Sequence, residues 1–181
     1  MSEQQSTIYL PRVVDPRKLA KKHQLLQGLV STKDMPRVQA LMNPSEAVCD
    51  FTVSMHFQVV DHKPVVDGSF EGQLPVDCLR CLQPMLYTLS GSMRLGIVID
   101  EDMIAIMDST REPWIVPEKM VNLCEAVEDE ILLAMPMVVY HDYQCVPVER
   151  FTVGDAKDIA SLEDKPNPFA ALKMLKETNQ D

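Results

Sequence analysis

Apolar and polar residues alternate along the middle of the chain. From Cys49 to Val59 every second residue is apolar, and the residues between them are polar. The same two-residue period returns over 66–76 and again over 84–99. Side chains of a β-strand point alternately to opposite faces, so the pattern predicts three long strands, each with a buried and an exposed face. The sequence DHKP at 61–64 predicts a turn that pairs the first two strands as a hairpin.

A longer period follows the strands, where apolar residues recur every three or four positions between Glu118 and Ala134. This spacing predicts an amphipathic helix. Its apolar stripe comprises Met120, Leu123, Cys124, Val127, Ile131 and Ala134. Its acidic, exposed face is expected to comprise Glu118, Glu125, Glu128, Asp129 and Glu130. Proline cannot continue a helix, so Pro136 should end it, and the apolar run at 137–140 predicts a short extended segment.

Two shorter helices are predicted before the strands. Asp15 followed by Pro16 is a helix-start signal, because the carboxylate can accept the first free N–H groups and proline fits the first helical position. This helix is expected to continue through RKLAKKHQLLQGL and to end near Gly28. A second short helix is expected over 31–42, before the Asn-Pro pair that follows it.

These elements predict an α+β fold in which an antiparallel sheet of three or more strands is covered by the helix at 118–134. The residues Trp114–Val116 predict a minor edge strand within an acidic loop. The predicted organisation is a flexible N-terminus at 1–9, one domain at 10–145, a linker at 146–165 and a C-terminal amphipathic helix with its tail at 166–181. Asn167 and Pro168 would start that last helix, and Phe169 would begin its apolar stripe.

Composition fits a single domain, because 181 residues with 46% hydrophobic content can bury one substantial core. The chain has no apolar run near the roughly 20 residues needed to cross a bilayer, and its start resembles no export signal. A cytoplasmic protein without a membrane partner is therefore expected. The five cysteines, an odd number without dense spacing, favour a reducing compartment in which they are thiols or metal ligands.

Charge is unevenly distributed along the chain, whose net charge is −10. Residues 1–45 carry seven Lys or Arg against three Asp or Glu, whereas residues 100–181 carry seven against eighteen. An acidic protein repels nucleic acid in bulk, although the basic N-terminal segment can still contact RNA locally. The cations expected there are Arg12, Arg17, Lys18, Lys21 and Lys22. The acidic surface suits a basic protein partner, and equally suits simple solubility.

The sequence Cys78-Leu79-Arg80-Cys81 lies between the second and third predicted strands, where two thiolates can bind one metal ion. Tetrahedral zinc needs four ligands, and the best remaining candidates are His141 and Cys145. Two alternatives stay open: a thiol-redox pair, or cysteines with only a structural role. Redox CxxC pairs normally open a helix after a strand, which this pair does not.

Other enzyme signatures are missing from the sequence. It contains no phosphate-binding glycine loop and no GxSxG. Glu128, Asp129 and Glu130 are consecutive on a predicted helix, so they point in different directions and cannot converge on one substrate. We therefore expect a protein that is not an enzyme.

Four ordered blocks of sequence resemble the YceD family, the bacterial large ribosomal RNA subunit accumulation proteins. The blocks are LPRVVDPRKLA, VDCLRCLQPM, VEDEILLAMPMVVYHDYQC and KPNPFAALKMLK, and they cover roughly residues 8–176. The resemblance implies a non-enzymatic factor in large-subunit biogenesis that promotes processing or stability of the ribosomal RNA. Its partner would be precursor RNA or a ribosomal protein.

The resemblance also implies which positions matter. Many members carry a further cysteine-rich segment that, with the CxxC, looks like a zinc site, and of that segment this chain keeps His141 and Cys145. The other positions that match the family motifs are Cys78, Arg80, Cys81, Glu128, Asp129, Glu130, Asn167, Pro168 and Phe169.

Overall fold

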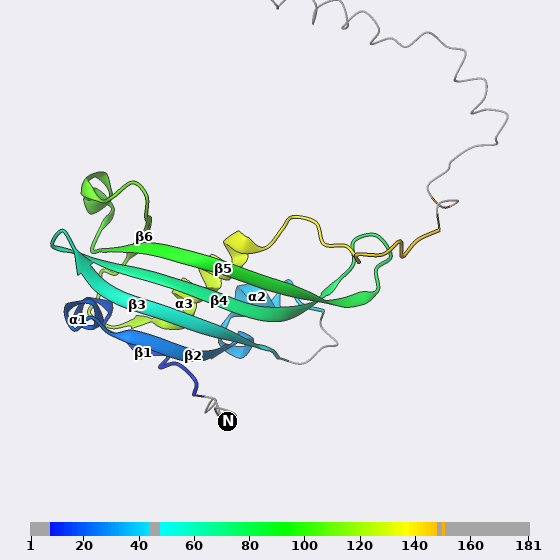
Figure 1. Cartoon of the computed structure of the whole chain (residues 1–181), viewed down its shortest axis with the longest axis horizontal. Coiled ribbons are helices and arrows are strands. Elements are labelled where there is room, and N and C mark those ends of the chain that lie inside the picture. Colours follow the sequence, from blue (N-terminus) through cyan, green and yellow to red (C-terminus); the bar gives the residue numbers. More distant parts are fainter. Residues whose placement is uncertain (1–7, 44–47, 148–149, 151–181) are drawn as a thin grey trace, which may run out of the picture. The chain divides into compact units, whose positions relative to one another are not determined.

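The centre of the protein is a five-stranded sheet in the order β2-β3-β4-β5-β6 (Figure 1). The structure is a computed structural model and describes residues 8–43, 48–147 and 150. The strands of this sheet are β2 (Leu25–Ser31), β3 (Asp50–Val60), β4 (Lys63–Asp77), β5 (Pro84–Val98) and β6 (Glu112–Ile115). All neighbours are antiparallel except β5 and β6, which are parallel. A separate small sheet pairs β1 (Val13–Val14) with β7 (Val121–Asn122).

The three long strands that the alternation predicted are confirmed, and the hairpin turn between the first two is present but shorter than predicted, since Lys63 and Pro64 already belong to β4. Along β3 the side chains of Phe51, Val53 and Met55 are fully buried, while the residues between them face solvent or are half-buried. Asp61 and His62 form the turn with φ of 49° and 63°. Positive φ at both central residues is typical of the tight hairpin turns whose twist matches that of the flanking strands.

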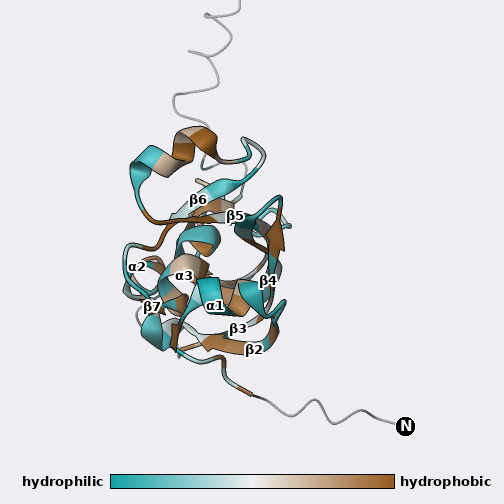
Figure 2. Ribbon diagram, turned by 90° about the vertical axis from the view of Figure 1, so that its left-hand side faces the viewer, coloured by the Kyte–Doolittle hydropathy of each residue, from teal (hydrophilic) through white to brown (hydrophobic). Residues whose placement is uncertain are grey.

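One face of the sheet is covered by three helices of the described chain, whereas the sequence predicted one. They are α1 (Pro16–Lys21), α2 (Pro36–Gln39) and α3 (Leu123–Ala134). Ala20, Val38 and Val127, one from each helix, belong to the same core as the inward residues of β3. Figure 2 shows the curved sheet wrapping around these helices.

The predicted N-terminal helix is wrong beyond Lys21. Asp15 does cap α1, accepting a hydrogen bond from the Lys18 N–H at 3.0 Å. The chain then turns through His23, whose φ is 50°, and the following residues form β2 instead of more helix. Strand β2 pairs with β3 over seven residue pairs and so supplies hydrogen-bond partners to the backbone groups along that edge of β3. This pairing overrides the local helical pattern.

The second short helix is confirmed in part, since it is split into two pieces. Ser31 caps a 3-10 helix, η1 (Thr32–Asp34), by accepting the Lys33 N–H, and α2 follows after Met35. A further 3-10 helix, η2 (Glu101–Ile106), lies in the acidic loop before β6, the edge strand that the sequence predicted.

Helix α3 starts five residues later than predicted. Asn122 caps it by accepting the Cys124 N–H, and the residue before Asn122 belongs to β7. Glu118 and Met120 therefore lie outside the helix, and Met120 is 48% exposed. The pairing of β7 with β1 holds this segment extended, and the helix ends at Ala134, before Pro136, as predicted.

Two phenylalanines of the core lie against glycines on the neighbouring strand. Phe51 is the register partner of Gly72, Phe70 is that of Gly91, and the two rings make an edge contact with centroids 6.2 Å apart. A Cβ atom on Gly72 would lie 2.6 Å from the Phe51 ring.

We therefore expect Gly72→Ala to lower the free energy of unfolding by about 1–3 kcal/mol, because the Phe51 ring must move within a close-packed core. Urea unfolding measures this, with Ser69→Ala on the exposed face of the same strand as the control, expected within about 0.5 kcal/mol of the parent. Equal stability of Gly72→Ala and Ser69→Ala would show that the ring moves without cost.

None of the helices in the described residues is long and apolar enough to span a bilayer. Of the predicted flexible N-terminus at 1–9, residues 1–7 lie outside the described residues, while Tyr9 forms a β-bridge with Leu29. Most of the predicted linker and the C-terminal helix with Asn167, Pro168 and Phe169 also lie outside the described residues.

Candidate metal centre

The CxxC pair lies in a tight connection between β4 and β5. The Cys78 N–H donates to the Gln83 carbonyl at 2.9 Å, and the Leu82 N–H donates to the Cys78 carbonyl at 2.8 Å. Leu82 adopts φ of 60°, which reverses the chain direction. Because the strands on both sides pair with each other, this loop holds Cys78 and Cys81 close together, with Cys78 fully buried and Cys81 half-buried.

The segment after α3 returns to this loop. Val139 is buried, and its carbonyl accepts a hydrogen bond of 2.9 Å from the Leu79 N–H. The run at 137–140 is irregular rather than a strand, so the predicted extended segment is held by this contact instead of a ladder. His141 follows two residues later and is half-buried.

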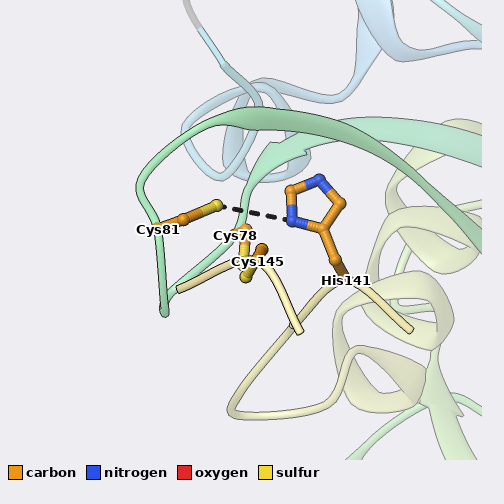
Figure 3. Close-up of side chains that lie close together, drawn as sticks. All are labelled: Cys78, Cys81, His141 and Cys145. Carbon is orange, nitrogen blue, oxygen red and sulfur yellow. Dashed lines mark hydrogen bonds between the residues drawn. The ribbon is translucent and has the colours of Figure 1, made fainter. Parts of the chain in front are cut away.

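The structure brings together the four residues that the sequence proposed as metal ligands. One atom each from Cys78, Cys81, His141 and Cys145 lies within 4.8 Å of all the others. The Cys81 Sγ and His141 Nδ1 atoms are 3.4 Å apart (Figure 3). Zinc with Zn–S bonds of about 2.3 Å and tetrahedral angles places its sulfur ligands about 3.8 Å apart, so the group needs only small movements to fit the ion.

The surroundings of Cys78 favour the thiolate that a metal requires. Burial disfavours the charged sulfur, but backbone N–H groups of Cys81, His141 and Arg80 are directed at it, and the Cys81 thiol adds a further contact. Together these donors lower the pKa of Cys78 from 9.0 to about 5. At neutral pH this ligand is therefore already deprotonated, so metal binding does not have to displace its proton.

Three sulfurs and one imidazole form a donor set typical of closed structural zinc sites. Such a site has all four positions filled by protein and no open position for substrate. The CxxC lies in a hairpin connection and opens no helix, so the helix-terminus stabilisation that redox pairs commonly use does not act on it.

Arg80, between the two cysteines, lies over the Tyr140 ring with its guanidinium carbon 4.8 Å from the ring centroid. This cation–π contact adds a second link between the CxxC loop and the segment after α3. The contact places Arg80 beside the candidate metal centre.

The predicted N-terminal cations separate into two groups. Arg12 pairs with Asp34 at 3.0 Å, and the Arg17 guanidinium donates to the backbone carbonyls of Val116 and Glu118, each at 2.7 Å. Lys18, Lys21 and Lys22 are exposed. Arg17 thus links α1 to the segment before β7, Arg12 is exposed but paired, and the three lysines are exposed cations without an ion pair in the described residues.

The prediction of an exposed acidic face is wrong for Glu128, which is 2% exposed. Its carboxylate accepts hydrogen bonds from the Arg37 and Val38 N–H groups at 2.6 and 3.2 Å and from the Arg37 guanidinium at 2.9 Å. Asp129 is exposed and pairs with the same guanidinium at 2.6 Å. Glu130 is half-buried, and its pKa is raised by burial and by its neighbours Glu112 and Asp129.

Two functional candidates were missed by sequence reasoning. Lys119 lies beside Lys18 and Lys21 although about 100 residues separate it from them, and Arg37 binds both Glu128 and Asp129. Neither has a local sequence signal, since each depends on contacts between distant segments.

Comparison with known proteins relates the whole chain to one family. The family model described as "Large ribosomal RNA subunit accumulation protein YceD" matches residues 66–176. The protein of that name from Haemophilus influenzae is 30% identical over 175 residues, which cover 94% of this chain and 98% of that protein. No solved structure matches the chain.

Proposed function

Since the chain belongs to the YceD family of large ribosomal RNA subunit accumulation proteins, we propose that it is a non-enzymatic factor in large-subunit biogenesis. It would promote processing or stability of the large-subunit ribosomal RNA by binding precursor RNA or a ribosomal protein. The observation that carries the proposal is the match to a relative of that name along nearly the full length of both chains.

The charges on the described surface favour RNA over a basic protein as the direct ligand. Of the three acidic positions expected to face a partner, Glu128 is buried and Asp129 is paired with Arg37. Glu130 is half-buried. By contrast, Lys18 and Lys21 keep their charges exposed, and exposed lysines are suited to phosphate contact.

Cells that lack this chain should contain less large-subunit ribosomal RNA relative to small-subunit RNA, since the proposed factor supports only the large subunit. The measurement is the ratio of the two mature RNAs together with the amount of large-subunit precursor, with and without the chain supplied from a plasmid. A ratio that does not change on deletion would contradict the proposal.

A second role, zinc binding, is favoured by the convergence of four ligand atoms on one point. We propose that Cys78, Cys81, His141 and Cys145 hold one structural zinc ion, which links the β4–β5 connection to the segment after α3. When bound, the ion would supply cross-linking rather than catalysis, because no coordination position stays open. Thiol-redox activity of the CxxC remains the competing role, and it predicts a reversible disulfide instead of bound metal.

A further inference from the structure

A hollow of about 540 Å³ lies on the surface where α1 meets the segment before β7. Its lining consists of Asp15, Arg17, Lys18, Lys21, Pro117 and Lys119. Four cations thus face one carboxylate in a protein whose net charge is −10. We call Lys18, Lys21 and Lys119 the lysine patch.

Arg17 assembles this patch. Its guanidinium donates hydrogen bonds to the carbonyls of Val116 and Glu118 and so fixes the backbone immediately before Lys119. Val116 is fully buried, so one end of the segment is held in the core while the other is bound to α1. As a result Lys119 is held next to two lysines from the opposite end of the sequence.

The charges of the lysine patch are not neutralised within the described part of the chain. No ion pair there includes Lys18, Lys21 or Lys119. Arg12, Arg37, Arg94 and Arg111 each pair with a carboxylate. Asp15, the one acid among the described lining residues, accepts the Lys18 N–H as the cap of α1, although its charge still reduces the local field.

The lining indicates which anion fits. Protein interfaces usually have an apolar centre, but Pro117 is the one apolar residue among the described residues of this hollow. Single-stranded nucleic acid is usually held by aromatic stacking, and no aromatic side chain occurs among the described lining residues. An open cationic surface with flexible lysines suits the phosphates of helical RNA, which proteins recognise through shape and backbone contacts.

We propose that the lysine patch binds the phosphate backbone of helical RNA, independently of base sequence. The inference rests on the proposed role in large-subunit RNA accumulation, and it names the surface and the ligand class for that role. Glu118, next to the patch, and the other acidic residues of the described surface repel RNA, so within the described residues they favour contact at the lysine patch.

The test uses the full chain and a fluorescent RNA duplex of mixed sequence, titrated at several salt concentrations. Three phosphate contacts should weaken the affinity of the parent roughly 20- to 40-fold between 50 and 200 mM salt. In Lys18→Gln/Lys21→Gln, the slope of log affinity against log salt concentration should fall to that of about one phosphate contact, and binding at low salt should weaken about tenfold. Adding Lys119→Gln to this double variant should remove the remaining salt dependence of binding.

The matched control is Lys33→Gln/Lys63→Gln, which removes the same charge from exposed lysines outside the hollow. It should bind duplex RNA within about twofold of the parent, because only local phosphate contacts set the affinity. Equal losses in both double variants, undiminished binding by the triple variant, or no duplex binding by the parent would each overturn the inference. Capture of an acidic protein by the patch in place of RNA would overturn it as well.

The same variants separate this inference from the broader function in cells. The triple variant should fail to restore the ratio of large- to small-subunit RNA in cells that lack the chain, whereas the control double variant should restore it. Full restoration by the triple variant would refute the RNA contact and leave the biogenesis role standing. An unaltered ratio of large- to small-subunit RNA in cells that lack the chain would refute the biogenesis role. The duplex titration in vitro would then still test whether the lysine patch binds RNA.

Discussion

Replacing Cys78 and Cys81 together by alanine is expected to eliminate bound zinc and to lower the free energy of unfolding by about 4 kcal/mol when free zinc is about 1,000 times its dissociation constant. The physical reason is that the folded chain holds four ligand atoms within 4.8 Å, whereas the unfolded chain holds no such arrangement. Zinc binding energy therefore becomes folding energy.

Metal analysis and thermal unfolding of the purified protein check this expectation. The parent should contain one zinc ion per chain, and a strong chelator should lower its melting temperature to that of the double variant. Because protons compete with zinc for the thiolate and imidazole ligands, zinc should be released as the pH is lowered into the acid range.

The matched control is Cys49→Ala/Cys124→Ala, which removes two thiols outside the ligand group. Burial raises the pKa of both thiols, which keeps them protonated and poor ligands, so the control should retain full zinc. Cys145→Ala removes one ligand and should weaken zinc binding without abolishing it. A metal-free parent that contains a disulfide between Cys78 and Cys81 would instead favour thiol-redox activity.

Glu128→Ala is expected to lower the free energy of unfolding by about 3 kcal/mol, because it removes a buried carboxylate that accepts hydrogen bonds from two backbone N–H groups and from the partly exposed Arg37 guanidinium. The start of α2 has no side-chain cap of its own. Glu128 supplies one from α3, since its carboxylate accepts the N–H groups of Arg37 and Val38. Truncation leaves these N–H groups buried without a partner, and it also leaves a cavity.

Urea unfolding of three variants separates this role from simple loss of charge. Glu128→Gln keeps the shape and one acceptor, so it should lose less stability than Glu128→Ala. Asp129→Ala removes the neighbouring carboxylate, whose side chain is 58% exposed, and should cost at most about 0.5 kcal/mol. Similar losses for Glu128→Ala and Asp129→Ala would contradict a specific capping role.

The long strands could be predicted from the sequence because their signal is local. A strand with one solvent-exposed face must alternate polar and apolar residues. Because a one-residue shift in register would expose every buried side chain, the pattern of β3, β4 and β5 permits one register. The end of α3 before Pro136 was predictable for a similar reason, since the missing N–H of proline stops a helix in any context.

The first helix shows where local signals fail. Leu26 and Leu29 fit a helical stripe with Leu19, yet they belong to β2 because β3 would otherwise present an unpaired edge. The hydrogen bonds and burial gained at that edge exceed the small local preference for helix. The same applies at 121–122, where pairing with β1 delays the start of α3.

For the candidate sites, the sequence by itself determined which residue types were present and their spacing: a CxxC, a later histidine and cysteine, and a cluster of N-terminal lysines. Only the tertiary structure decided that Cys78 and Cys81 face His141, that Glu128 caps a distant helix instead of facing solvent, and that Lys119 lies beside Lys18. The physical reason is that periodicity and capping act between residues a few positions apart. Ligand groups, buried ion pairs and charged patches are instead made by segments that the sheet and core pack together.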